Sequence, residues 1–176
     1  PLGECMIREP ETLQMLVDTV RQFVSETLIP RENEVAETDE IPQDIVEQMK
    51  ALGLFGLTIP EEYEGLGLTM EEEVYVAFEL GRTSPAFRSL IGTNNGIGSS
   101  GLIIDGTEAQ KSFFLPRLAR GEVISSFCLT EPDAGSDAAS LKTTEHIFFE
   151  NPVIAQDGIY ADVTGTGAGY IVYYGG

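Results

Sequence analysis

The feature that most constrains this chain is a change in hydrophobic periodicity near residue 123. Before this point, apolar residues recur at steps of three and four, which is typical of helices that bury one face. After it, β-branched and aromatic runs at residues 123–129, 147–149 and 170–174 favour strands. The pattern predicts an α+β fold, with an N-terminal all-α helical domain at residues 1–122 and a partial β segment at residues 123–176.

Two helices are predicted in the first third of the chain. Apolar side chains at helical spacing between residues 13 and 24 predict a helix that ends near Pro30. A second helix begins at Pro42, since proline is tolerated in a first turn, and ends at Gly53.

Capping boxes predict the starts of two later helices. Thr69 with Glu72 begins a helix that runs to about residue 80, and acidic residues in its first turn suit the helix dipole. Thr107 with Gln110 begins a short helix that Pro116 is expected to stop.

Residues 86–104 are predicted to form one buried helix between these two. They combine bulky apolar side chains with four glycines, which lower helix stability unless a backbone or a ligand approaches closely. Close packing against neighbouring helices and the lining of a ligand slot are both consistent with this composition. Lys111 and Arg117, further along, are expected to be solvated.

Turn-forming and polar residues gather where the first predicted strand ends. Residues 130–140 cannot continue it, because Pro132 lacks an N–H donor and Gly135 frees the backbone to turn. Sites are often built at such strand ends, although by pattern alone a plain surface turn is the simpler interpretation. The glycines at residues 165–169 predict a flexible loop, since their spacing is not that of the dinucleotide fingerprint.

Composition excludes several classes of function. The 176 residues are 42% hydrophobic, and 29 acidic against 10 basic residues give a net charge of -19, so we expect no nucleic-acid partner. Cys5 and Cys128 do not form a disulfide framework or a metal-ligand spacing, which favours a reducing compartment. No apolar stretch approaches the ~18 residues of a transmembrane segment. A soluble protein of the bacterial cytoplasm or the mitochondrial matrix is expected.

The sequence does not favour a hydrolase with a nucleophilic serine or cysteine, or a reactive thiol. His146 is the single histidine, and no serine or cysteine stands in a nucleophile motif around it. Apolar neighbours make Cys128 an unreactive thiol. The glutamates at positions 61, 62 and 64 flank a glycine-rich turn and are expected to be solvated rather than catalytic.

Two longer motifs resemble a known family. Residues 59–68 read IPEEYEGLGL, and residues 127–137 read FCLTEPDAGSD. Both closely resemble signature segments of the acyl-CoA dehydrogenase family of flavoproteins. The spacing between them is also similar to that family, and the resemblance extends from about Glu11 to Thr144.

The resemblance implies that residues 127–136 contact FAD. Phe127 and Gly135 belong to this contact set, Leu129 would act through its backbone, and Thr130 would bond the flavin ring. Ser136 would meet both the cofactor pyrophosphate and the pantetheine arm of the substrate. A strand end that turns through glycine and serine offers the hydroxyl and main-chain donors that a flavin nucleotide needs.

The resemblance also implies a reaction and partners. In that family a glutamate removes the α-proton of an acyl-CoA thioester while the β-hydrogen leaves as hydride to flavin N5, and 2-enoyl-CoA is released. Electrons then pass to an electron-transferring flavoprotein, and the enzyme is normally a homo-oligomer. Part of the fatty-acyl slot is placed along Ser89, Thr93 and Ile97. The family's catalytic base lies outside the matching residues, so no catalytic residue is assigned.

The resemblance ends after Thr144. The family continues through strands that include a tryptophan-or-phenylalanine, isoleucine, threonine run over the flavin, whereas residues 145–176 depart from its pattern and the chain has no tryptophan. Residues 147–153 weakly resemble a strand near the end of the family's middle domain, and residues 165–170 the entry to its final helices. A natural deletion, a truncation or a change of reading frame would each explain this, and turnover by these residues alone is not expected.

Two other functions stay open at this point. An acyl-CoA oxidase would share these motifs, because oxygen reactivity is controlled by access to the flavin. A non-catalytic helical module would instead bind a partner through an exposed apolar patch. The preferred acyl chain length and branching are not defined by these residues.

Overall fold

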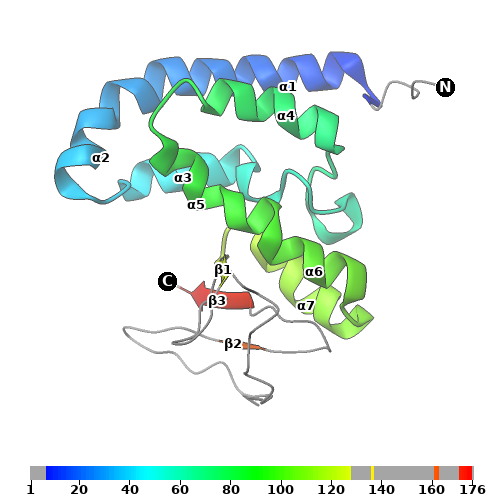
Figure 1. Cartoon of the computed structure of the whole chain (residues 1–176). Helices are drawn as coiled ribbons and strands as arrows, with labels where there is room; N and C mark the ends of the chain where they lie inside the picture. The colour runs from blue at the N-terminus through cyan, green and yellow to red at the C-terminus, as the bar shows by residue number, and fades with distance from the viewer. Residues whose placement is uncertain (1–6, 128–135, 137–160, 163–170, 176) are drawn as a thin grey trace.

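The described part of the chain is helical up to residue 119 and has its first strand at residues 123–127. The computed structural model describes residues 7–127, 136, 161–162 and 171–175. Figure 1 shows the helices above and the strands below, with α1 along the top. The helices are α1 Pro10–Phe23, α2 Glu32–Thr38, α3 Gln43–Ala51, α4 Met70–Leu80, α5 Pro85–Asn95, α6 Ile97–Asp105 and α7 Glu108–Ala119. The strands are β1 Val123–Phe127, β2 Ala161–Asp162 and β3 Ile171–Gly175, and the predicted α+β fold is confirmed.

The described strands form one antiparallel sheet in the order β1-β3-β2. Val123 pairs with Gly175 and Phe127 with Ile171, so the tail that departs from the family pattern lies beside the first strand. The predicted strand at residues 170–174 corresponds to β3, whereas β2 was not predicted. The predicted strand at residues 147–149 and the predicted loop at residues 165–169 lie outside the described residues. The domain boundary at residue 122 stays a prediction.

The first helix was predicted to continue to Pro30, but α1 ends at Phe23. It passes into a π-helical turn at Val24–Leu28, a 3-10 turn at Ile29–Arg31 and then α2, which was not predicted. Proline is accepted here because it lies in the first turn of the 3-10 segment, where its missing N–H costs no hydrogen bond. The side chains of Val24 and Leu28 are fully buried, so the wider turn keeps them facing the core.

The predicted helix ends are largely confirmed. Helix α3 follows Pro42 and is closed by Gly53, which has a φ of 70°. Both capping boxes are present. Thr69 accepts a bond from the main-chain N–H of Glu72, and the Glu72 carboxylate accepts one from the main-chain N–H of Thr69. The box at the start of α7 is built in the same way.

The prediction of one helix over residues 86–104 is wrong. The chain breaks at Gly96, whose φ of -127° and ψ of -110° are not helical, and α5 and α6 result. The break redirects α6 so that its first turn lies against β1, which both helices contact. The spacing of apolar residues could not predict the break at Gly96, because the break depends on packing against a strand some 30 residues later.

The prediction that Pro116 stops α7 is also wrong. The helix continues to Ala119, and Leu115, Leu118 and Ala119 are buried. Their burial offsets the hydrogen bond that proline cannot donate. Lys111 is less solvated than predicted, since its side chain is 18% exposed and its ammonium lies 3.3 Å from the Glu108 carboxylate. Arg117 keeps 38% of its side chain exposed, with its guanidinium 5.1 Å from the centre of the Phe113 ring.

The core has two parts. The larger cluster joins α1, α3, α4 and α5, with Phe55, Phe87 and Met49 among its fully buried members. A smaller cluster lies where α6, α7 and β1 meet, and its buried residues are Ile59, Leu102, Leu115, Leu118, Ala119 and Val123. The first strand is therefore held by apolar packing as well as by its pairing with β3.

The turn at residues 59–68 folds back on the segment before it. The N–H groups of Leu66 and Gly67 donate to the carbonyls of Gly56 and Ile59, both at 2.8 Å. A Cβ added to Gly65 would lie 1.9 Å from the Ile59 carbonyl oxygen, so only glycine fits. The glutamates at positions 61, 62 and 64 are exposed, as predicted.

We expect Gly65→Ala to lower the free energy of unfolding by about 2 kcal/mol or more, because main-chain atoms must move to admit the methyl group. Urea unfolding followed by circular dichroism measures this. Gly92→Ala is the matched control, since the added Cβ would meet only the flexible end of Arg88. Equal stability of Gly65→Ala and wild type would contradict the tight-turn interpretation.

A buried carboxylate fixes the start of α4. The residue Glu72 is 3% exposed and accepts bonds from the main-chain N–H groups of Arg8 and Thr69, each at 2.8 Å. The Arg8 guanidinium approaches the same carboxylate at 3.4 Å. Burial by itself raises the pKa of Glu72, but these donors outweigh burial and hold that pKa below its usual range.

The lowered pKa of Glu72 predicts a loss of stability in acid. The ionised carboxylate contributes fully above the unfolded pKa of about 4.3, and the contribution is lost as pH falls through the folded pKa. We expect Glu72→Gln to be less stable than wild type at pH 7, and the gap to narrow below pH ~4. Urea unfolding at both pH values checks this, with the exposed Glu62→Gln as control. A gap that is constant with pH would rule out the assigned role of the carboxylate.

Candidate functional site

The candidate site lies where β1 leaves the helices, and Asn94 holds this junction. The residue is fully buried at the end of α5. Its amide nitrogen donates to the carbonyls of Leu118 at 3.1 Å and Val123 at 2.8 Å. Its amide oxygen accepts the Ser125 main-chain N–H at 2.8 Å and the Ser125 hydroxyl at 3.0 Å. One side chain therefore joins α5, α7 and β1.

Helix α6 approaches β1 at Gly98. A Cβ on Gly98 would lie 1.9 Å from the Ser125 hydroxyl oxygen and 2.7 Å from the Thr93 carbonyl oxygen, so no larger residue fits there. Ser125 is buried in this contact. The close approach fixes the direction in which β1 leaves the helical domain.

Asn95 ties the same end of α5 to the segment before the 59–68 turn. Its amide nitrogen donates to the carbonyls of Leu54 at 2.7 Å and Ile91 at 3.1 Å. The Thr58 hydroxyl donates to the Asn95 carbonyl. The two asparagines hold the candidate site in place structurally, and the sequence analysis missed both. The available signal was a pair of adjacent asparagines, poor helix formers, inside an apolar helical pattern.

Two of the five predicted FAD-contacting residues, Phe127 and Ser136, are among the residues that the structure describes. Phe127 is the last residue of β1, and its backbone is paired with Ile171. Ser136 is exposed. Leu129, Thr130 and Gly135 lie outside the described residues, so the proposed FAD contacts of the whole set stay a prediction.

The predicted substrate-lining residues lie on α5 and at the start of α6. Ser89 and Thr93 are one turn apart on α5, and Ile97 begins α6. Ser89 is exposed, Thr93 is half-buried and Ile97 is 48% exposed, so all three are accessible. Helices α5 and α6 both contact β1, and the substrate-lining role of the three residues stays a prediction.

The junction is electrically neutral. The groups bonded around Asn94 are amides, hydroxyls and carbonyls, with no ionisable side chain among them. Within residues 7–127 and the other described positions, no three histidine, cysteine or acidic side chains gather to hold a metal ion.

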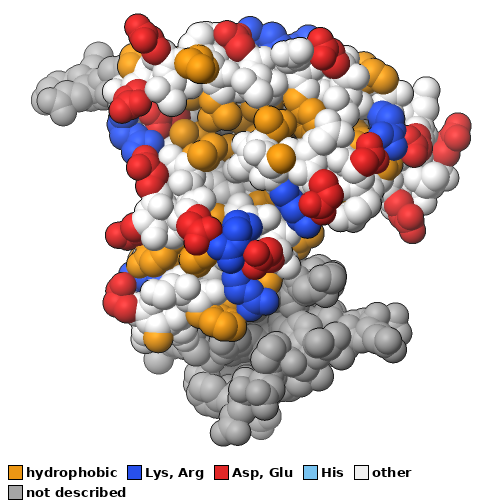
Figure 2. Space-filling view, turned by 180° about the vertical axis from the view of Figure 1, so that it is seen from behind, with side chains coloured by type: hydrophobic (Ala, Val, Ile, Leu, Met, Phe, Trp, Pro, Cys, Tyr) orange, Lys and Arg blue, Asp and Glu red, His pale blue; other side chains and the backbone are white. Residues whose placement is uncertain are grey.

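A separate groove opens between α1 and the 59–68 turn. Its volume is about 540 Å³, and Figure 2 shows hydrophobic side chains gathered in a hollow beneath α1 with charged groups at the rim. Leu13, Leu16, Leu66 and Leu68 supply its apolar wall, and Arg8 and Glu72 lie at one end. The sequence analysis did not predict this groove, because its two walls come from segments about 50 residues apart.

The comparisons with known proteins agree with this architecture. The fold and the junction describe a helical domain that leads into a β domain, and the family model described as "Acyl-CoA dehydrogenase, N-terminal domain" matches residues 10–122. The chain therefore belongs to the acyl-CoA dehydrogenase family, as the two motifs predicted.

Individual relatives match the same part of the chain. The (2S)-methylsuccinyl-CoA dehydrogenase of Cereibacter sphaeroides is 42% identical over 134 residues, which are 76% of this chain and 24% of that protein. The mitochondrial very long-chain specific acyl-CoA dehydrogenase of Macaca fascicularis is 38% identical over 77% of this chain and 20% of its own length.

A solved structure of an acyl-CoA dehydrogenase also matches this chain. The crystal structure of an acyl-CoA dehydrogenase from Bacillus anthracis, complexed with FAD, has a TM-score of 0.65 and 31% identity, and covers 80% of this chain and 25% of that one. The chain thus spans a quarter or less of the length of these three proteins. Among the described helices, none is long and apolar enough to cross a bilayer.

We expect Asn94→Asp to lower the free energy of unfolding by about 3 kcal/mol, because a carboxylate cannot donate to two buried carbonyls. Thermal and urea unfolding measure the change. Asn33→Asp makes the same chemical change at an exposed position and should stay within ~0.5 kcal/mol of wild type. Comparable losses in both variants would mean that Asn94 does not hold the junction.

Proposed function

We propose that this chain supplies part of the FAD and acyl-CoA site of an acyl-CoA dehydrogenase. The reaction would be the FAD-dependent α,β-dehydrogenation of an acyl-CoA thioester to 2-enoyl-CoA. The observation that carries the proposal is the position of the FCLTEPDAGSD motif, which begins at the last residue of a strand that Asn94 anchors to the helical domain. Family membership and the FAD-bound relative support it.

The chemistry of the donor set fits a flavin nucleotide. An isoalloxazine ring needs main-chain and hydroxyl donors at its polar edge, and a pyrophosphate also needs hydrogen-bond donors. Leu129 would bond the ring through its backbone and Thr130 through its hydroxyl, with Phe127 beside them. Gly135 would let the chain approach the pyrophosphate, to which the exposed Ser136 hydroxyl would donate. Bound FAD would supply the hydride-accepting chemistry.

The acyl-CoA would pass along α5 and α6. Ser136 would also orient the pantetheine arm, and Ser89, Thr93 and Ile97 would line part of the acyl slot and keep water from it. A base that removes the α-proton is not assigned within these residues. We therefore propose that the described part binds and orients, and that proton removal needs a carboxylate outside the matching residues.

The proposal extends to partners and place of action. Electrons would pass to an electron-transferring flavoprotein, and the assembly would be a homo-oligomer in the bacterial cytoplasm or the mitochondrial matrix. The matching relatives include bacterial and mitochondrial proteins, which supports both compartments. An oxidase would share the same strand-end contacts, and oxygen consumption with acyl-CoA would distinguish the two.

FAD binding is the direct test of the proposed site. We expect added FAD to raise the melting temperature of this chain, because a ligand at 100 times its Kd stabilises the folded state by about 2.7 kcal/mol. Calorimetry and flavin absorbance after desalting measure the effect. Ser136→Ala should reduce the shift, whereas Ser100→Ala, at an exposed position on α6, should leave it unchanged. A colourless chain with no shift would count against the proposal.

A second candidate function is a non-catalytic module that binds a protein partner. The observation that favours it is the exposed apolar surface at Met15, Met70, Val74, Tyr75 and Phe78, which exceeds what single scattered residues explain. The FAD test separates the candidates, since a module needs no flavin.

A further inference from the structure

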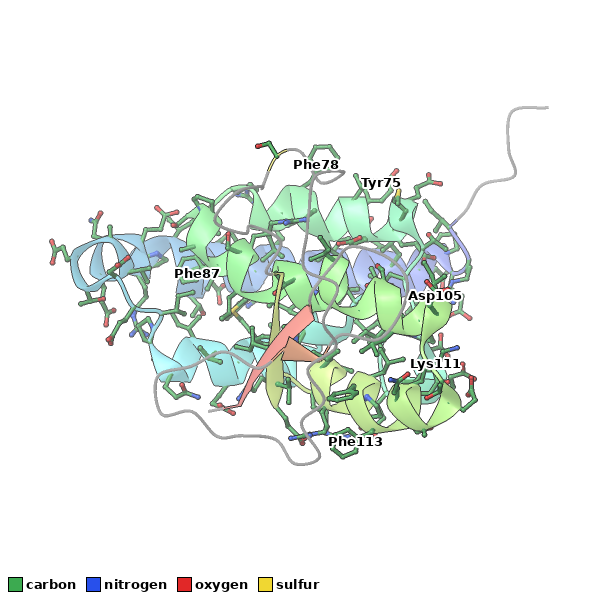
Figure 3. The ribbon with its side chains drawn as sticks, turned by 60° about the horizontal axis from the view of Figure 1, so that its bottom comes forward. Tyr75, Phe78, Phe87, Asp105, Lys111 and Phe113 are labelled. Atoms are coloured by element: carbon green, nitrogen blue, oxygen red, sulfur yellow. The ribbon has the colours of Figure 1, made fainter. Side chains whose placement is uncertain are left out.

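Helix α4 presents apolar side chains to solvent. Its exposed apolar residues are Met70 at 76%, Val74 at 45%, Tyr75 at 44% and Phe78 at 72%. Met70, Val74 and Phe78 are spaced four residues apart, so they lie on one side of the helix over about 12 Å. Tyr75 and Phe78 stand together at one edge of the molecule in Figure 3. We call these four residues the α4 stripe.

Two of the four glutamates of α4, Glu72 and Glu79, are turned away from solvent instead. Glu72 is buried against Arg8. The Glu79 side chain is 12% exposed and bonds Arg21 at 2.8 Å and Arg82 at 2.9 Å. A surface helix ordinarily shows the opposite arrangement, with its charges outward. Since α4 also buries Val76 and Leu80, it has apolar groups on both sides. A helix with apolar groups on two sides can pack against its own domain on one side and against a partner on the other.

The stripe has the composition of a binding surface. Methionine and aromatic residues are enriched at the centres of protein interfaces, and a row at four-residue spacing receives the apolar face of another helix. Helices α1 and α5 already cover the flanks of α4, so the stripe is the side that is left for a partner.

Charge indicates which helix fits. Glu71 and Glu73 lie beside the N-terminal half of the stripe, and the chain as a whole carries -19. A second copy would bring the same negative charge to the contact, which opposes pairing. A helix with lysine or arginine beside its apolar row would be attracted and held in register by the two glutamates.

We propose that the α4 stripe docks a separate amphipathic helix whose apolar row is flanked by basic residues. The occupant is a protein helix, and its recognition needs neither flavin nor acyl-CoA. The contact would bury Met70, Val74, Tyr75 and Phe78 and place basic side chains next to Glu71 and Glu73.

The test uses a labelled helical peptide with leucine at positions i, i+4 and i+8 and lysine and arginine on the flanks. Fluorescence anisotropy with the intact chain measures binding. We expect Phe78→Ser and Met70→Ser each to weaken affinity about tenfold, which corresponds to about 1.4 kcal/mol. Phe113→Ser is the matched control, because Phe113 is 54% exposed on α7 at the opposite edge in Figure 3, and should change affinity less than about twofold.

A second pair of measurements tests the charge. The double variant Glu71→Gln, Glu73→Gln should bind the basic peptide several-fold more weakly and with less salt dependence. A peptide with glutamate flanks and the same leucines should bind wild type at least about tenfold more weakly than the basic one. Equal affinity for both peptides, or equal effects of Phe78→Ser and Phe113→Ser, would overturn the proposal. Self-association of wild type that Phe78→Ser abolishes would overturn it too, in favour of a second copy.

Discussion

The candidate site depends on the buried amide of Asn94. Its four hydrogen bonds satisfy the carbonyls at the end of α7 and the start of β1 together with the N–H of Ser125. Without them, polar main-chain groups would be left unpaired in the smaller core, at a cost of about 1–3 kcal/mol for each group. The strand therefore leaves the helical domain in one direction, and its close approach to α6 leaves no room for a side chain at Gly98. Any group placed at the end of β1 inherits this orientation.

Local signals were sufficient to predict much of the helical domain. The capping boxes at Thr69 and Thr107 and the end of α3 at Gly53 depend on residues within one turn, so the sequence contains all the information they need. The same holds for the change of periodicity at β1. The strand-end motif was recognised by resemblance, and its spacing alone would have been consistent with an ordinary turn.

The incorrect predictions have nonlocal causes. The break at Gly96 depends on how closely α6 must approach Ser125, and the passage of α7 through Pro116 depends on the burial of Leu118 by other elements. The groove under α1 and the Asn94 contacts join residues far apart in the chain, so neither could be predicted from periodicity or composition. In each case tertiary packing outweighed a local preference.

The π-helical turn at Val24–Leu28 makes the length of α1 more critical than its surface composition. Val20, Val24 and Leu28 are fully buried at intervals of four, although a regular helix would rotate each successive member away from the core. The one extra residue in the turn absorbs this rotation. Loss of a single residue there would swing the following segment by about 100°, enough to carry Leu28 out of its packing. Ser25 and Glu26 are exposed, so the fit of this segment to the core depends on the number of residues in the turn and not on these two side chains.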